Sequence, residues 1–144
     1  MSKVGFKTLN QERAKFASKR IQAVKDGKLT FKNKKGQKET ANQRKFATYA
    51  KRLPALIITN GLLPTLAFLA SKDDSRAVYE TLVKWLQEKD YITKNDLDKA
   101  IDEVASMDAS NLRAITTEAL AFADWLKRLS EAYLSDEEGD GQES

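Results

Sequence analysis

Apolar residues recur every three or four positions along almost the whole chain, which is the spacing of one face of an α-helix. The longest such run comprises Leu112, Ile115, Ala119, Phe122, Leu126, Leu129 and Tyr133. Helix breakers are rare, since the 144 residues include 6 glycines and 2 prolines. The one strand candidate, at 29–31, is short and flanked by lysines. The sequence therefore predicts an all-α fold, a compact single-domain bundle of five or six helices.

Caps and stops divide the chain into segments. The first three helices are predicted at about 10–26, from the cap residue Thr40 to Asn60, and from around Pro64 to about 71. Three more are predicted to begin at residue 73 or 74, at the cap residue Thr93 and at the cap residue Ser110. The lysine-rich segment 27–39 is expected to be a loop. The helical domain is expected to span 1–134. Residues 135–144 form an acidic tail without an apolar anchor, which predicts disorder.

The absence of cysteine and histidine limits the chemistry available to this chain. It excludes disulfides, zinc sites built on those residues, thiol nucleophiles and histidine-based triads. We expect no cofactor, no metal, no catalytic residue and no small-molecule substrate. The apolar stretch 53–70 is interrupted by Asn60, Gly61 and prolines, which argues against a membrane span. Without a signal core or a disulfide framework, a cytoplasmic location is expected.

Charge is divided unevenly along the chain. Residues 1–60 hold 16 Lys and Arg against 3 Asp and Glu, a net charge of +13. Residues 61–144 hold 9 against 18, a net charge of −9. Such a division favours a basic surface for a polyanion, although the two halves can also mix once the chain folds.

The basic residues of the first two predicted helices fall on the faces opposite their apolar stripes. On a helical wheel Phe46, Ala50 and Leu53 point inward. Four cations of this helix and two of the first helix point outward: Arg44, Lys45, Lys51, Arg52, Lys15 and Lys19. Residues 40–60 contain no acidic residue that could neutralise them. We therefore expect these six cations to form one strip that contacts nucleic-acid phosphates.

Three functions remain open at this point. No zinc-finger spacing, RNP-type strand or KH-type loop is present, so nucleic-acid binding would be through the backbone with little sequence preference. A protein–protein adaptor whose basic face binds an acidic partner is the alternative. A magnesium-dependent nuclease is disfavoured, because Asp96, Asp98, Asp102 and Glu103 do not share one helix face.

The segment KRLPALIITNGLLPTLAFLASK, residues 51–72, resembles the signature of the small-subunit family of the Cmr effector complex, the type III-B CRISPR machine. The matching features are a basic residue before LPALI, then TNGL, then TLAFL. RAKFA near residue 13 and ADWLKRLSEAYL at 123–134 also resemble the family's first and last helices. The apolar members of the motif, Leu56 among them, are expected in the core, as are Trp85 and Trp125.

The resemblance implies an all-helical, non-catalytic structural subunit for antiviral defence. Copies of such a subunit stack on one another beside the other Cmr subunits, and together they line the groove for target RNA paired to CRISPR RNA. By position, the six cations of the first two helices match the family's charged groove surface. The implied partners are CRISPR RNA, target RNA, other Cmr subunits and neighbouring copies of the same chain. No membrane contact is implied.

Overall fold

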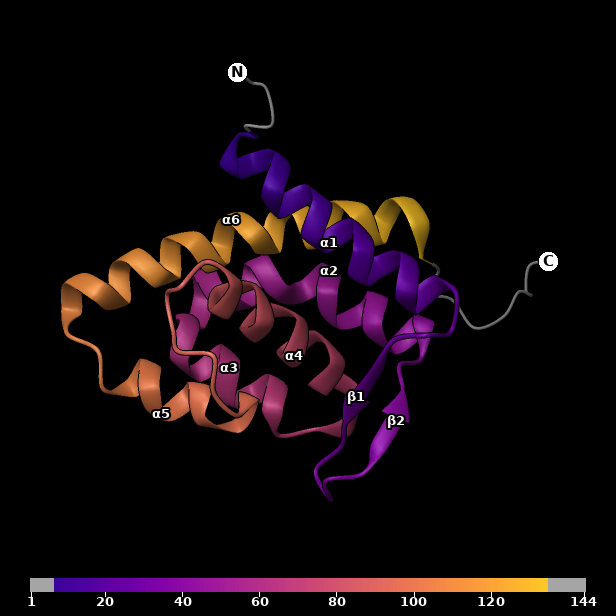
Figure 1. Ribbon diagram of the computed structural model, residues 1–144, viewed down its shortest axis with the longest axis horizontal. Coiled ribbons are helices and arrows are strands. Elements are labelled where there is room, and N and C mark those ends of the chain that lie inside the picture. Colours follow the sequence, from indigo (N-terminus) through magenta and orange to yellow (C-terminus); the bar gives the residue numbers. More distant parts are fainter. Residues whose placement is uncertain (1–6, 135–144) are drawn as a thin grey trace.

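Six α-helices pack around one core and a short hairpin projects from it in the computed structural model (Figure 1). The structure describes residues 7–134, so the acidic tail expected at 135–144 lies outside the described residues. The elements are α1 (Leu9–Lys25), β1 (Thr30–Lys32), β2 (Lys38–Thr40), α2 (Gln43–Asn60), α3 (Leu62–Ala70), α4 (Asp73–Glu88), the 3₁₀-helix η1 (Leu97–Lys99), α5 (Ala100–Ala105) and α6 (Ala109–Tyr133). The predicted all-α bundle is confirmed.

The long helix α6 packs against both α1 and α2, while α4 packs against α2 and α3 (Figure 1). At the centre of the bundle the ring of Trp85 stacks on Phe122, with 5.2 Å between centroids. Phe16 of α1 contacts both rings, at 5.3 and 5.9 Å. The core position predicted for Trp85 is therefore correct. Trp125 is only partly buried, and its Nε1 donates to Asn10 Oδ1.

A buried ion pair joins α1 to α6. Glu118 Oε1 and Oε2 accept hydrogen bonds from Arg13 Nη2 and Nε, both at 2.7 Å, and Oε2 also accepts one from Trp85 Nε1 at 2.9 Å. Burial alone would raise the pKa of Glu118, but these hydrogen bonds and the charge of Arg13 outweigh it and lower the pKa. The hydrogen bond to Glu118 raises the pKa of Arg13. Both groups are therefore charged at neutral pH.

Several predicted caps are wrong by a few residues. Asn42 rather than Thr40 caps α2, and its Oδ1 accepts from the Lys45 N–H at 2.9 Å. Asp108 rather than Ser110 caps α6. Thr93 caps no helix, because its hydroxyl donates to Glu103 Oε1 at 2.8 Å. The predicted stop at Asn60 is confirmed, since α2 ends there and Gly61 follows with φ +86°.

Most but not all of the apolar residues expected in the core from the segment 51–72 are buried. Leu53, Ile57, Leu62, Leu66 and Leu69 are core residues. Leu56 is only half-buried, which contradicts its expected place in the core. The reason is that α2 continues through Pro54 without a break, so the inward face runs through 53 and 57 and leaves 56 beside it.

The lysine-rich segment 27–39 is not a loop. It forms most of a two-stranded antiparallel hairpin, in which Thr30 pairs with Thr40 and Lys32 with Lys38. Within β1 only Phe31 is buried, and it packs in the core. Strands of three residues are too short to give the alternation by which strands are predicted, so contacts distant in sequence must define this hairpin.

Candidate nucleic-acid interface

Two of the six predicted cations, Lys15 and Lys19, lie on the exposed face of α1. They are four residues apart, which is about 6 Å along the helix. The residues that hold α1 in this orientation are Ala17 and Ile21, which are fully buried in the core. The sequence pattern of α1 therefore turns both lysines toward solvent, beside the C-terminal half of α4.

A groove runs between α1 and α4. It has two parts, of about 310 and 480 Å³, that share Phe16, Lys19 and Glu88. We call it the α1–α4 groove, and its lining residues are Lys7, Glu12, Lys15, Phe16, Lys19, Arg20, Lys84, Trp85, Gln87, Glu88, Lys89, Lys94 and Asn95. Seven of these side chains are cationic and two are acidic. Since Lys89 forms an ion pair with Glu12, the groove retains a strong positive charge.

The other four predicted cations lie on α2. Lys45 forms an ion pair with Asp74 at 3.0 Å, in which both side chains are about half exposed, so the pair is weak. The guanidinium of Arg52 lies over the rings of Tyr49 and Phe68, at 5.5 and 5.8 Å from their centroids. Arg44 and Lys51 are half-buried.

The structure places the α1 cations and Lys45 at opposite ends of α4. Lys15 and Lys19 lie beside Glu88, whereas Lys45 pairs with Asp74. Fourteen residues of helix separate Glu88 from Asp74, which is about 20 Å. Lys45 therefore lies far from Lys15 and Lys19, and the six cations do not form the single strip expected from the helical wheels.

Sequence reasoning missed the α4 side of the groove. Lys84, Lys89 and Lys94 come from the half of the chain that is acidic on average, so neither net charge nor a wheel of α1 or α2 points to them. On a helical wheel Arg20 falls beside the apolar stripe of α1, so it does not stand out as part of an outward cationic face. Their spacing gave no signal either, because Lys84 and Lys89 are five residues apart and so do not share one face of a helix.

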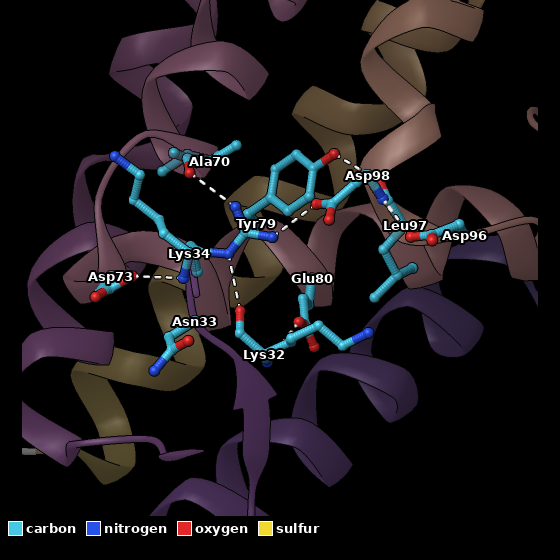
Figure 2. A network of polar contacts seen from close by, with 12 residues as sticks. Lys32, Asn33, Lys34, Ala70, Asp73, Tyr79, Glu80, Asp96, Leu97 and Asp98 are labelled. Atoms are coloured by element: carbon cyan, nitrogen blue, oxygen red, sulfur yellow. Dashed lines mark hydrogen bonds and ion pairs between the residues drawn. The ribbon is translucent and has the colours of Figure 1, made fainter. Parts of the chain in front are cut away.

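A network of polar contacts joins the hairpin to α4, and α4 in turn to η1 (Figure 2). Arg76 Nε donates to the Lys32 carbonyl at 2.8 Å and its Nη2 pairs with Asp98 at 2.7 Å. Glu80 Oε2 accepts from the Lys32 N–H at 2.9 Å, and Asp73 Oδ1 accepts from the Lys34 N–H at 2.8 Å. The five lysines of 27–39 are all exposed, so this hairpin presents further positive charge on a fixed support.

The carboxylates considered for a metal site have other roles. Asp96 caps η1, Asp98 pairs with Arg76 and Glu103 binds Thr93. Within residues 7–134 no group of three or more acidic side chains could hold a metal ion. No helix in this part of the chain is long and apolar enough to cross a membrane.

Fold and groove together define a small helical-bundle protein with a polycationic surface. A family model described as CRISPR-associated protein (Cas_Cmr5) matches residues 9–133. The chain therefore belongs to the Cmr5 family, the small subunits of the type III-B (Cmr) CRISPR complex. The fold is similar to the X-ray crystal structure of a CRISPR-associated Cmr5 family protein from Thermus thermophilus. That match has a TM-score of 0.71 and 22% identity, and covers 90% of this chain and 100% of the other.

Proposed function

We propose that this chain is a non-catalytic RNA-binding subunit that lines the groove for target RNA paired to CRISPR RNA. Guide pairing would supply the sequence choice, and this subunit would supply charge and shape to the phosphate backbone. The contacting cations are Lys15, Lys19, Arg44, Lys45, Lys51 and Arg52. Contacts with neighbouring copies and with other Cmr subunits hold it in the complex.

The α1–α4 groove is the observation that carries this proposal. Seven cationic side chains line it, and among its described carboxylates only Glu88 is left without a cationic partner. A surface of this kind is unfavourable in isolation because like charges repel, and it becomes favourable when a polyanion releases its counterions there. Lys15 and Lys19 are one helical turn apart at its edge, a spacing that suits contacts with successive phosphates of one backbone.

The cations of α2 provide a second contact surface at a distance from the groove. Arg52 beside Tyr49 and Phe68, together with Lys72 at 4.9 Å from the Phe68 ring centre, combines positive charge with aromatic rings. Single-stranded nucleic acids bind surfaces that join these two features. Two separated groups of cations suit an extended ligand that passes over both.

The test is target-RNA capture by the reconstituted Cmr complex at several salt concentrations. One variant carries Lys15→Glu and Lys19→Glu, and a second carries Lys51→Glu and Arg52→Glu. A control with Lys99→Glu and Arg113→Glu makes the same charge change at exposed positions outside the groove. We expect both test variants to bind RNA more weakly. The slope of log K against log salt should be about 1.4 shallower for loss of two phosphate contacts.

Binding equal to that of the control at every salt concentration would overturn the proposal. Unchanged circular dichroism would show that the variants remain folded. If the first variant fails to assemble with other subunits while the RNA affinity of the isolated chain is unchanged, the basic surface binds an acidic protein instead.

A further inference from the structure

The guanidinium of Arg20 uses only part of its hydrogen-bonding capacity. Its Nε donates to Thr81 Oγ1 at 3.0 Å, and that hydroxyl donates to the Ala77 carbonyl at 2.9 Å. Its Nη2 is buried and has no hydrogen-bond partner among the described residues. A buried charged donor without an acceptor is costly, and native structures rarely keep one without a reason.

Lys84 lies on α4 close enough to Arg20 for the two positive charges to repel. Burial and, secondly, the charge of Arg20 lower the pKa of Lys84. Burial also lowers the pKa of Arg20, although the negative charge of Glu80 opposes this effect. Neither cation forms an ion pair with a carboxylate of the described residues. Two partly desolvated cations thus lie close together, and neither is in an ion pair.

The negative charge of Glu80 acts on both cations, but the hydrogen bond that Glu80 accepts comes from the hairpin and not from either cation. Its side chain is almost fully buried, and Oε2 accepts the backbone N–H of Lys32, which fixes it to the hairpin. Among the described residues Glu80 forms no ion pair with Arg20 or Lys84. The positive charge of Arg20 and Lys84 is left facing the α1–α4 groove.

The larger part of this groove, about 480 Å³, has room for a phosphate group with its neighbouring sugars. Lys19 and Lys94 add charge at the rim. Gln87 Nε2 donates to the Thr93 and Asn95 carbonyls at 3.2 and 2.9 Å, which holds the segment carrying Lys94 in place. Arginine and lysine around one space are the usual means of binding a phosphate.

We propose that Arg20 and Lys84, with Lys19 and Lys94 at the rim, form a subsite for a single phosphate group. Because this inference rests on the proposed function, that phosphate is a phosphodiester of the RNA backbone. The anion supplies a counter-charge to both cations. The subsite thus fixes one point of the strand, whereas Lys15 and Lys19 contribute more diffuse attraction.

The first test measures thermal unfolding of the full chain with inorganic phosphate, against sodium chloride of equal ionic strength. We expect phosphate to raise the Tm of the wild type and to have no such effect on Lys84→Met. This substitution keeps the aliphatic stem and removes a repelled charge, so without phosphate the variant should be at least as stable as the wild type. Lys99→Met, which changes an exposed lysine outside the groove, should respond as the wild type does. Equal phosphate responses in wild type and Lys84→Met would overturn the subsite.

The second test measures target-RNA affinity of the complex that carries Lys84→Met. We expect affinity to fall about tenfold at low salt, the effect of one charged hydrogen bond. The salt slope should be about 0.7 shallower, as for one lost phosphate contact. If only the Lys15 and Lys19 variant loses RNA, the proposed function holds and the subsite is wrong. If Lys84→Met abolishes the phosphate response but no groove variant loses RNA, the subsite binds a free phosphate and the RNA function is wrong.

Discussion

Replacing Arg13 by methionine should destabilise this protein more than an ordinary surface substitution. Glu118 is 3% exposed, and Arg13 donates two of the three hydrogen bonds that its carboxylate accepts. Arg13→Met leaves a buried charge with one hydrogen bond, from Trp85. Removing one partner of a buried ion pair costs about 3–5 kcal/mol. Since the Arg13 side chain is 15% exposed and water can reach its edge, we expect the lower end, about 3 kcal/mol.

The double variant Arg13→Met, Glu118→Gln should recover most of this loss. The amide introduced at 118 carries no charge, and its oxygen still accepts the hydrogen bond from Trp85 Nε1. Replacing both partners of a buried pair by uncharged groups of similar volume is often close to neutral. We therefore expect the double variant to lie within about 1 kcal/mol of the wild type.

Urea unfolding followed by tryptophan fluorescence measures both differences, because Trp85 stacks on Phe122 in the core and reports its loss. Circular dichroism should give the same midpoint if unfolding is two-state. A loss under about 1 kcal/mol for Arg13→Met would show that the buried carboxylate does not depend on its partner. A double variant as unstable as the single one would assign the effect to lost packing instead.

Three further predictions concern stability. The pKa of Glu118 is lowered in the folded protein, so its stabilising effect is complete above the ordinary carboxyl value and is lost as pH falls through the folded value. The free-energy gap between wild type and Glu118→Gln, from urea titrations, should shrink below about pH 4.5. Gly61→Ala should cost about 1–3 kcal/mol in the same assay, because φ is +86° and ψ is 166°, a conformation that alanine rarely adopts, while the new Cβ meets nothing closer than Pro64 Cδ at 3.9 Å. Leu53→Ala should cost about 2–5 kcal/mol and lower Tm accordingly, whereas Leu56→Ala, at a half-buried position, should cost clearly less.

Most of the fold could be predicted from local pattern. The apolar residues of α4 and α6 recur with the helical spacing and not with that of a strand. Gly27 and Gly61, both at positive φ, follow the ends of α1 and α2 where expected. The hairpin could not be predicted in this way. Its single buried strand residue, Phe31, gives no alternation, and its attachment depends on Arg76 and Glu80, more than 40 residues away.

The site was predictable only one helix at a time. A wheel correctly gives the exposed face of α1, but of the four α2 cations only Arg52 is well exposed. A wheel also cannot say that α6 supports both helices or that α4 closes a groove beside α1. Glu118 offered a signal, because a carboxylate beside Ala119 and Phe122 interrupts an apolar stripe. Its partner Arg13 is 105 positions away, and sequence spacing alone cannot pair them.

The hairpin is held mainly by main-chain atoms. Arg76 donates to the carbonyl of Lys32, while Glu80 and Asp73 accept from the N–H groups of Lys32 and Lys34. Every residue type except proline offers these main-chain groups. The amino-acid types at the outward positions of the hairpin therefore do not affect how the hairpin is attached to α4. The lysines of the hairpin can be replaced by other side chains, which would change its surface chemistry, while the hydrogen bonds that attach it to α4 are kept.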